Sequence, residues 1–101
     1  MADVTVGNKK RIAVATGVKQ RLVFEPPIDN LILKKIGSGT IAYMVNAIEA
    51  DMADINEEEA NSLTDDFATR DLYKPNGIRH LVIISDADVT LELDTEKTKL
   101  L

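Results

Sequence analysis

The chain of 101 residues contains no cysteine, no tryptophan and only one histidine, and its aromatic residues are two tyrosines and two phenylalanines. Without cysteine there is no disulfide framework, thiolate zinc site or thiol redox chemistry. Four aromatic residues, not interleaved with a basic stripe, do not make a stacking platform for nucleic acid. We therefore expect no nucleic-acid partner.

Long apolar runs are also missing. No run approaches the roughly 18 residues of a membrane span, and the first residues, MADVTVGNKK, lack the apolar stretch of a secretory signal. We expect a single domain with no membrane partner, made in the cytoplasm without a cleaved leader.

Charge is present in quantity and is unevenly distributed. The net charge is −5. Residues 1–48 carry seven basic and three acidic side chains, whereas residues 49–66 carry eight acidic and no basic ones. Such asymmetry favours contact with charged protein surfaces, including those of other copies of the chain.

The first half of the chain predicts two β-hairpins. RIAVAT (11–16) and RLVFE (21–25) have strand composition and flank a turn at Gly17. Pro26-Pro27 cannot continue a central strand, so we expect the chain to turn or cross over there. NLILKKI (30–36) and TIAYMVNA (40–47) then flank a second turn.

The second turn, Gly37-Ser38-Gly39-Thr40, has two possible interpretations. A phosphate-binding loop requires G-x-x-x-x-G-K-[ST], whereas these glycines are one residue apart and no lysine follows them. Tight hairpins use glycine because it adopts positive φ at little cost. The sequence therefore predicts a turn between strands.

The acidic segment 47–70 is open to two interpretations. Ile48, Met52 and Ile55 fit one helical face, and Asn56 followed by Glu57, Glu58 and Glu59 is typical of a capping box. A short helix from about Glu57 to Leu63 and a long surface loop between strands both remain open.

The last third predicts a third hairpin. IRHLVIIS (78–85) has the composition of a buried strand, and VTLELD (89–94) alternates apolar and polar residues after a break at Asp86-Ala87-Asp88. The expected fold is mainly β: a small antiparallel sandwich, or a barrel-like sheet, with a short acidic helix or long loop in the middle. We expect an N-terminal arm at 1–10, the sandwich domain at 11–95 with the acidic insert 47–70, and a tail at 96–101.

No residue set identifies a reaction. His80 lies between Ile78 and Val82 on an apolar strand face and has no nucleophile motif beside it, so we expect a half-buried structural histidine. Asp54, Asn56, Glu58 and Asp65 resemble a calcium loop, but Glu59 stands where that loop needs glycine. We expect no enzyme activity, cofactor or metal.

Two stretches carry a resemblance to a known class of proteins. IDNLILKKIGSGTIAYMVNA (28–47) and LYKPNGIRHLVIISDADVTLELD (72–94) resemble small β-sandwich proteins of tailed-phage virions, the capsid decoration or cement proteins. The resemblance covers about residues 28–94, and the acidic segment departs from it. It implies a non-enzymatic protein on the outer surface of a capsid, made in the host cytoplasm, that binds the major capsid protein and copies of itself as a trimer or dimer.

The residues expected to bind partners lie at the root of the arm, in the acidic segment and at the C-terminus: Lys9, Lys10, Arg11, Glu57, Glu58, Glu59, Leu100 and Leu101. Two other functions are open. A tail or connector protein of a virion would do similar work, and a carbohydrate- or ligand-binding sandwich would use Tyr43, Tyr73 and the Asp86/Asp88 turn.

Overall fold

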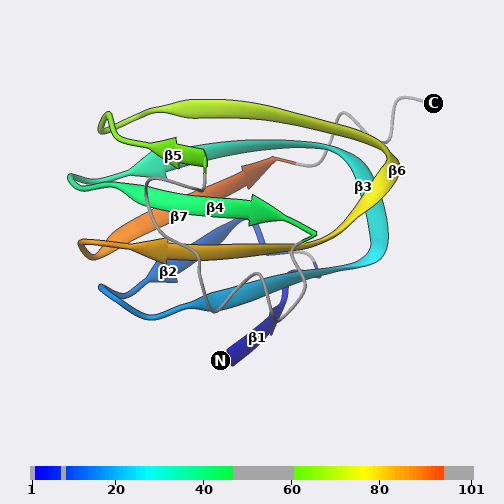
Figure 1. The fold of residues 1–101 in the computed structure, drawn as a ribbon, viewed down its shortest axis with the longest axis horizontal. Helices are drawn as coiled ribbons and strands as arrows, with labels where there is room; N and C mark the ends of the chain where they lie inside the picture. Colours follow the sequence, from blue (N-terminus) through cyan, green and yellow to red (C-terminus); the bar gives the residue numbers. More distant parts are fainter. Residues whose placement is uncertain (1, 8, 47–60, 95–101) are drawn as a thin grey trace.

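In the computed structural model, the chain forms a single sheet of seven strands that curls strongly into half of a barrel (Figure 1). The structure describes residues 2–7, 9–46 and 61–94. The strands are β1 (Ala2–Thr5), β2 (Arg11–Val14), β3 (Gln20–Ile36), β4 (Ile41–Val45), β5 (Asn61–Leu63), β6 (Thr69–Ser85) and β7 (Val89–Asp94). The expected antiparallel, mainly β fold is confirmed. The described ranges contain no helix, and hence none that could cross a membrane.

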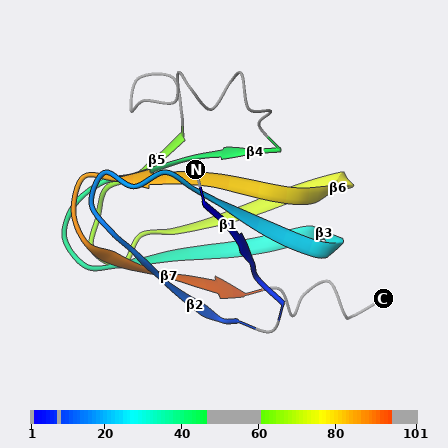
Figure 2. The ribbon, with the colours of Figure 1, turned by 90° about the horizontal axis from the view of Figure 1, so that it is seen from below.

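The strand order is β2-β7-β3-β6-β4-β5, all antiparallel, and β1 adds to β3 in parallel. The curl makes two layers. The β2 layer contains β2, β7, the second half of β3 and the first half of β6. The β4 layer contains β1, the first half of β3, the second half of β6, β4 and β5. Figure 2 shows β4 and β5 on one side of the molecule and β2 and β7 on the other.

Two strands of 17 residues, β3 and β6, belong to both layers because each bends in the middle. The chain crosses over at Pro26-Pro27, as expected, but it does so inside β3, and the expected end of the strand there is wrong. The proline pair lies where the β3–β6 register shifts between Val23 and Ile28, so the missing proline N–H groups fall at an irregularity in the ladder. Orthogonal sheet corners are commonly made in this way.

The three expected hairpins are wrong as pairings, although the strands lie close to where the sequence placed them. β2 pairs with β7, β3 with β6 and β7, and β4 with β6 and β5. The connections β2–β3, β3–β4, β5–β6 and β6–β7 each pass from one layer to the other. Turn residues mark where the chain reverses, but they do not decide whether the next strand pairs beside the last or packs across the core from it.

The core lies between the layers. Inward positions alternate along each strand, as at Leu31 and Leu33 on β3 and at Leu91 and Leu93 on β7, all at most 3% exposed. Each such side chain stabilises the fold by about 1.5–3 kcal/mol. On β6, Val82 is buried as well as Leu81 and Ile83, which explains the continuous apolar run of this strand.

The segment expected to be a loose arm is part of the sheet. β1 pairs with β3, Val6 is 3% exposed, and Arg21 binds Asp3 through two hydrogen bonds of 2.8 and 3.0 Å. This hydrogen bonding holds the pKa of Asp3 below its ordinary value. Burial of Val6 contributes about 1.5 kcal/mol or more, which offsets the backbone entropy of about one ordered residue, and the pairing of β1 with β3 adds to it.

The acidic segment is only partly described. Residues 61–63, the end of the expected helix, form β5, which pairs with β4 through Ile41 and Leu63. Burial of Leu63 favours this pairing over a helical turn. Residues 65–67 form a bend and turn before β6 begins at Thr69. The rest of the expected helix or loop, 47–60, lies outside the described residues.

Candidate functional site

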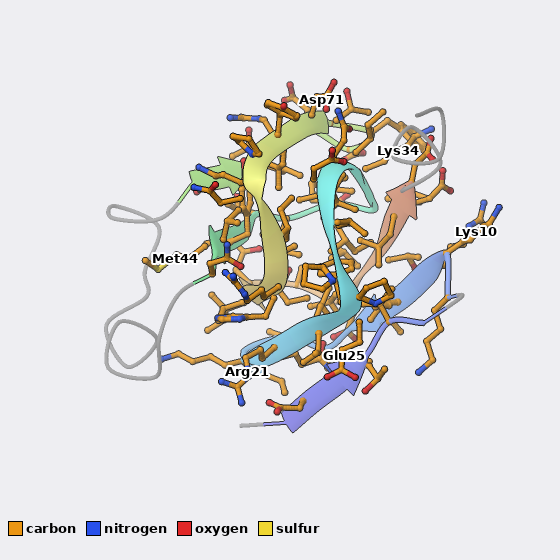
Figure 3. All side chains as sticks on the ribbon, turned by 90° about the vertical axis from the view of Figure 1, so that its right-hand side faces the viewer. Lys10, Arg21, Glu25, Lys34, Met44 and Asp71 are labelled. Atoms are coloured by element: carbon orange, nitrogen blue, oxygen red, sulfur yellow. The ribbon has the colours of Figure 1, made fainter. Side chains whose placement is uncertain are left out.

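An open groove of about 1180 Å³ lies at the bends of β3 and β6. Its walls are the β1–β2 connection, the proline bend of β3, the bend of β6 and the end of β7: Val6, Gly7, Lys9–Arg11, Phe24–Asp29, Pro75–Gly77 and Glu92–Asp94. Figure 3 looks onto this end of the molecule, with Glu25 and Lys10 labelled.

The bend of β6 is fixed by its neighbours. Gly77 has φ +98°, and a Cβ atom there would lie 3.2 Å from Cβ of Pro27 on the adjacent bend. Asn46, at the end of β4, donates from Nδ2 to the Gly77 carbonyl (2.9 Å) and accepts from the Arg79 N–H (2.8 Å). Asn46 therefore holds the bend of β6 in place, and this bend lies close against the proline bend of β3.

The rim of the groove carries both signs of charge. Lys9, Lys10 and Arg11 lie on it, and Glu25, Asp29, Glu92 and Asp94 also line it. Arg11 forms an ion pair with Glu92 at 3.1 Å and remains 68% exposed. The basic cluster that the sequence predicts is therefore partly balanced by acids from β3 and β7.

Main-chain bonds hold this basic cluster in place. The Lys9 N–H donates to the Val6 carbonyl and the Leu93 N–H to the Lys10 carbonyl, both at 2.8 Å, and the Val6 N–H donates to the Val23 carbonyl at 2.9 Å. Lys9 and Lys10 are thus exposed side chains on a fixed backbone. Such side chains lose little further backbone entropy when they bind a partner.

Only part of the predicted partner-binding set can be placed. Lys9, Lys10 and Arg11 come together on the groove rim. Glu57, Glu58, Glu59, Leu100 and Leu101 lie outside the described residues. Lys35, one of the basic residues of the first half of the chain, is 0% exposed, and its Nζ donates to the Gly37 carbonyl. Its ammonium group is therefore out of reach of a partner at the surface.

The side chains of the carbohydrate-binding interpretation do not form one site. Tyr43 is 1% exposed in the core, where burial raises its pKa, whereas Tyr73 is 63% exposed on the outer face of β6. Asp86 and Asp88 lie in the β6–β7 connection and accept hydrogen bonds from Thr40 N–H (2.7 Å) and from Thr16 N–H and hydroxyl (both 2.9 Å). The two aspartates tie neighbouring connections together.

His80 is half-buried, as expected, on the outer face of β6 opposite Val23. Its main-chain N–H donates to Oδ1 of Asn46 at 3.2 Å. Among the described residues, no group of three or more His, Cys, Asp or Glu side chains is placed to hold a metal ion.

Sequence reasoning missed the acidic and proline walls of the groove. Glu25 and Asp29 of β3 are far along the chain from Glu92 and Asp94 of β7, and both pairs line one groove with Lys9 because β7 pairs between β2 and β3. Local strand patterns carry no signal for this order. Only the two proline-containing bends, separated by about half the chain, could have suggested a shared corner.

Comparison with known proteins gives no further guide to the groove. No family model, no curated protein and no solved structure matches the chain significantly.

Proposed function

We propose that this chain is a non-enzymatic structural protein that binds other proteins through the groove at the bends of β3 and β6. The observation that carries the proposal is that the exposed side chains of Lys9, Lys10 and Arg11 line a groove together with Phe24, Pro26 and Pro27. Apolar floors with charged rims are the usual anatomy of protein–protein contacts.

The charges support a protein partner over a small anion. A basic cluster, Lys9–Arg11, and four acidic side chains line the same groove, so a partner surface must offer both signs of charge in matching places. Mixed rims of this kind select orientation and partner more than they add affinity.

We place this protein, more specifically, on a phage particle, as a capsid decoration or cement protein that binds the major capsid protein and other copies of itself at the outer surface of the shell. The finer proposal rests on the resemblance of residues 28–47 and 72–94 to such proteins. A tail or connector protein would use the same groove at another place in the particle.

Co-sedimentation tests this proposal. The purified chain is incubated with shells assembled from the major capsid protein of the phage that encodes it, and the bound fraction is measured at low and high salt. We expect saturable binding that weakens with salt, and at least tenfold weaker binding of the double variant Lys9→Ala/Lys10→Ala, which corresponds to about 1.4 kcal/mol.

The matched control is Lys74→Ala/Arg79→Ala, which removes the same charge from exposed β6 positions outside the groove. It should bind like the unmodified chain. Equal loss in both double variants would show that net charge, and not the groove, drives binding. No co-sedimentation at any salt concentration would refute the shell as partner.

A further inference from the structure

The β2 layer ends in two exposed strands, β2 on one side and the first half of β6 on the other. In the described part of the chain, β2 pairs only with β7, and residues 69–73 of β6 pair only with β3. Figure 3 labels Lys10 near one of these edges and Asp71 on the other, with Lys34 of β3 between them. Open edges are sites where another strand can add.

The hydrogen-bond alternation shows which groups the β2 edge offers. The Leu93 N–H donates to the Lys10 carbonyl, so Ile12 and Leu91, two residues further along the ladder, form the next hydrogen-bonded pair. Arg11 and Ala13 fall at the intervening positions. Their N–H and C=O groups therefore point away from β7, toward the open side.

The same reasoning applies to β6. The Lys35 N–H donates to the Ala68 carbonyl, so Leu33 and Arg70 form the next hydrogen-bonded pair with β3. The main-chain groups of Thr69 and Tyr73 consequently point away from β3. Thr69 and Tyr73 have their side chains on the outer face, as do Arg11 and Ala13 on β2, and all four residues are exposed.

We propose that β2 of one copy of this chain adds, antiparallel, to β6 of the next copy, with Ala13 opposite Thr69, to form a head-to-tail assembly. Neighbouring strands of the β2 layer, in the order β2-β7-β3-β6, run in opposite directions. If the next copy has the same orientation, its β2 therefore runs antiparallel to β6 of the first copy. The two residues of a hydrogen-bonded antiparallel pair have their side chains on the same face of the sheet. Ala13 and Thr69 meet this condition, because both side chains lie on the outer face.

Charge supports this register. With Ala13 opposite Thr69, Arg11 of one copy lies opposite Asp71 of the other, and opposite charges in cross-strand pairs are stabilising. Pairing of β6 with β6 of another copy is less favourable in two registers, because like charges then lie opposite each other. One register places the two Asp71 side chains opposite each other, and the other places the two Arg70 side chains opposite each other. Head-to-tail contacts close into rings or continue as filaments, so of the expected trimer and dimer this contact favours the trimer or a larger ring.

At Ala13 the β2 edge also permits close approach. Natural edges are usually protected by lysine, proline or bulges, but Ala13 presents only a methyl group, and a second, shallow hollow of about 390 Å³ lies beside it. On the β6 edge, Tyr73 is 63% exposed and Phe67, just before the strand, is 66% exposed. Exposed aromatic residues are frequent anchors of protein contacts.

Proline at position 13 tests the contact on the full chain. The Ala13 N–H makes no bond within the sheet, so Ala13→Pro keeps the intramolecular ladder but removes the donor offered to a neighbour. We expect the unmodified chain to sediment as species larger than a dimer, and Ala13→Pro to sediment as a monomer. Ala13→Ser, which retains the N–H, should assemble like the unmodified chain.

Cysteine cross-linking provides a second test that does not depend on tolerance of proline. The chain has no cysteine, so Ala13→Cys and Thr69→Cys can be made separately and mixed under mild oxidation. Opposed residues of a hydrogen-bonded pair have Cα atoms about 5.5 Å apart, within disulfide range. The mixed disulfide between the two variants should be the main product.

The inference deepens the self-association in the proposed function but does not depend on the groove or the shell. It is overturned if the unmodified chain is a monomer, or a dimer only, at all concentrations tested. It is also overturned if Ala13→Pro assembles unchanged, or if each cysteine variant links to itself as readily as to the other. Lys9→Ala/Lys10→Ala co-sedimentation separately tests shell attachment.

Discussion

The two ends of the curled sheet are held together by different means. At the end with the bends, shown at the right of Figure 1, β3 and β6 pass without interruption from one layer to the other. At the opposite end, separate connections meet and are joined by side chains. Asp86 binds Thr40, and Asp88 binds Thr16.

This difference shows where the fold can accommodate a binding surface. At the bends, the continuous strands β3 and β6 join the two layers, so no further contacts are needed on the outer side of the bends. The groove with Lys9 and Lys10 lies on this outer side. The connection end needs close contact between Gly39 and Ala87 to close the layers. We therefore expect the connection end to be sensitive to substitution and the groove rim to tolerate it.

The largest effect is expected at the connection end, at Gly39. Its φ is +117°, and a Cβ atom there would lie 2.7 Å from both Ala87 Cβ and Asp86 Oδ1. Backbone strain and overpacking together should make Gly39→Ala about 4 kcal/mol less stable. Urea unfolding followed by circular dichroism measures the loss.

Gly17→Ala is the matched control, because Gly17 also has positive φ (+73°), but a methyl group added there would meet nothing within 4 Å. It should cost about 1 kcal/mol, from backbone strain alone. If the two substitutions cost the same, close contact at Gly39 does not hold the layers together.

At the bend end, Gly77→Ala should have an intermediate effect of about 2 kcal/mol. The φ of +98° is unfavourable for alanine, but the nearest atom, Pro27 Cβ, is 3.2 Å away and can yield slightly. Thermal unfolding measures the change. A loss larger than that of Gly39→Ala would reverse the comparison between the two ends.

A smaller, pH-dependent effect is expected from Asp88. Hydrogen bonds from the Thr16 N–H and hydroxyl hold its pKa below the ordinary 3.8. Since the folded pKa lies below the unfolded one, the carboxylate stabilises the fold above about pH 4, and this contribution is lost as pH falls through the folded pKa. Asp88→Asn should therefore lose less stability than the unmodified chain on acidification below about pH 4.

Melting temperatures of both proteins between about pH 5 and pH 2 test this expectation. Asp3→Asn is a useful comparison, because the pKa of Asp3 is lowered by Arg21 at a site away from the connections. Parallel melting curves for Asp88→Asn and the unmodified chain would show that the Asp88–Thr16 contact does not contribute.

The smallest effect is expected between the two ends, at Tyr43. Its hydroxyl is buried and has no hydrogen-bond partner among the described residues. Replacement by phenylalanine removes an unsatisfied polar group, so Tyr43→Phe should be about 1 kcal/mol more stable. If Tyr43→Phe instead unfolds at a lower urea concentration than the unmodified chain, the Tyr43 hydroxyl forms a hydrogen bond in the folded protein.

The positions of most strands follow from local patterns, because apolar alternation and turn residues act over a few neighbours. VTLELD and IRHLVIIS are strands, as their composition predicts, and the apolar run of β6 is buried. Pairing is a long-range property. Gly37-Ser38-Gly39 marks a reversal equally well in a hairpin and in a connection between layers, and nothing local separates β3–β4 pairing from β3–β7 pairing.

The candidate site is predictable only in part for the same reason. The basic cluster at Lys9–Arg11 is visible in the sequence, but Glu92 and Pro26 join it through strand order and through bends in the middle of strands. The proline pair predicts the end of a strand, yet β3 continues through it. The β3–β6 register shifts at the prolines, so no ladder hydrogen bond requires the N–H groups that proline lacks.

Strand pairing underlies the groove, the connections and the open edges, so the most direct test is an NMR measurement of contacts between main-chain Hα protons. Non-hydrogen-bonded antiparallel pairs bring the two Cα atoms to about 4.5 Å, which gives strong Hα–Hα nuclear Overhauser effects. We predict such signals between Ala13 and Thr90 and between Lys34 and Thr69. Signals instead between residues 11–14 and 20–25, as a β2–β3 hairpin would give, would contradict the account.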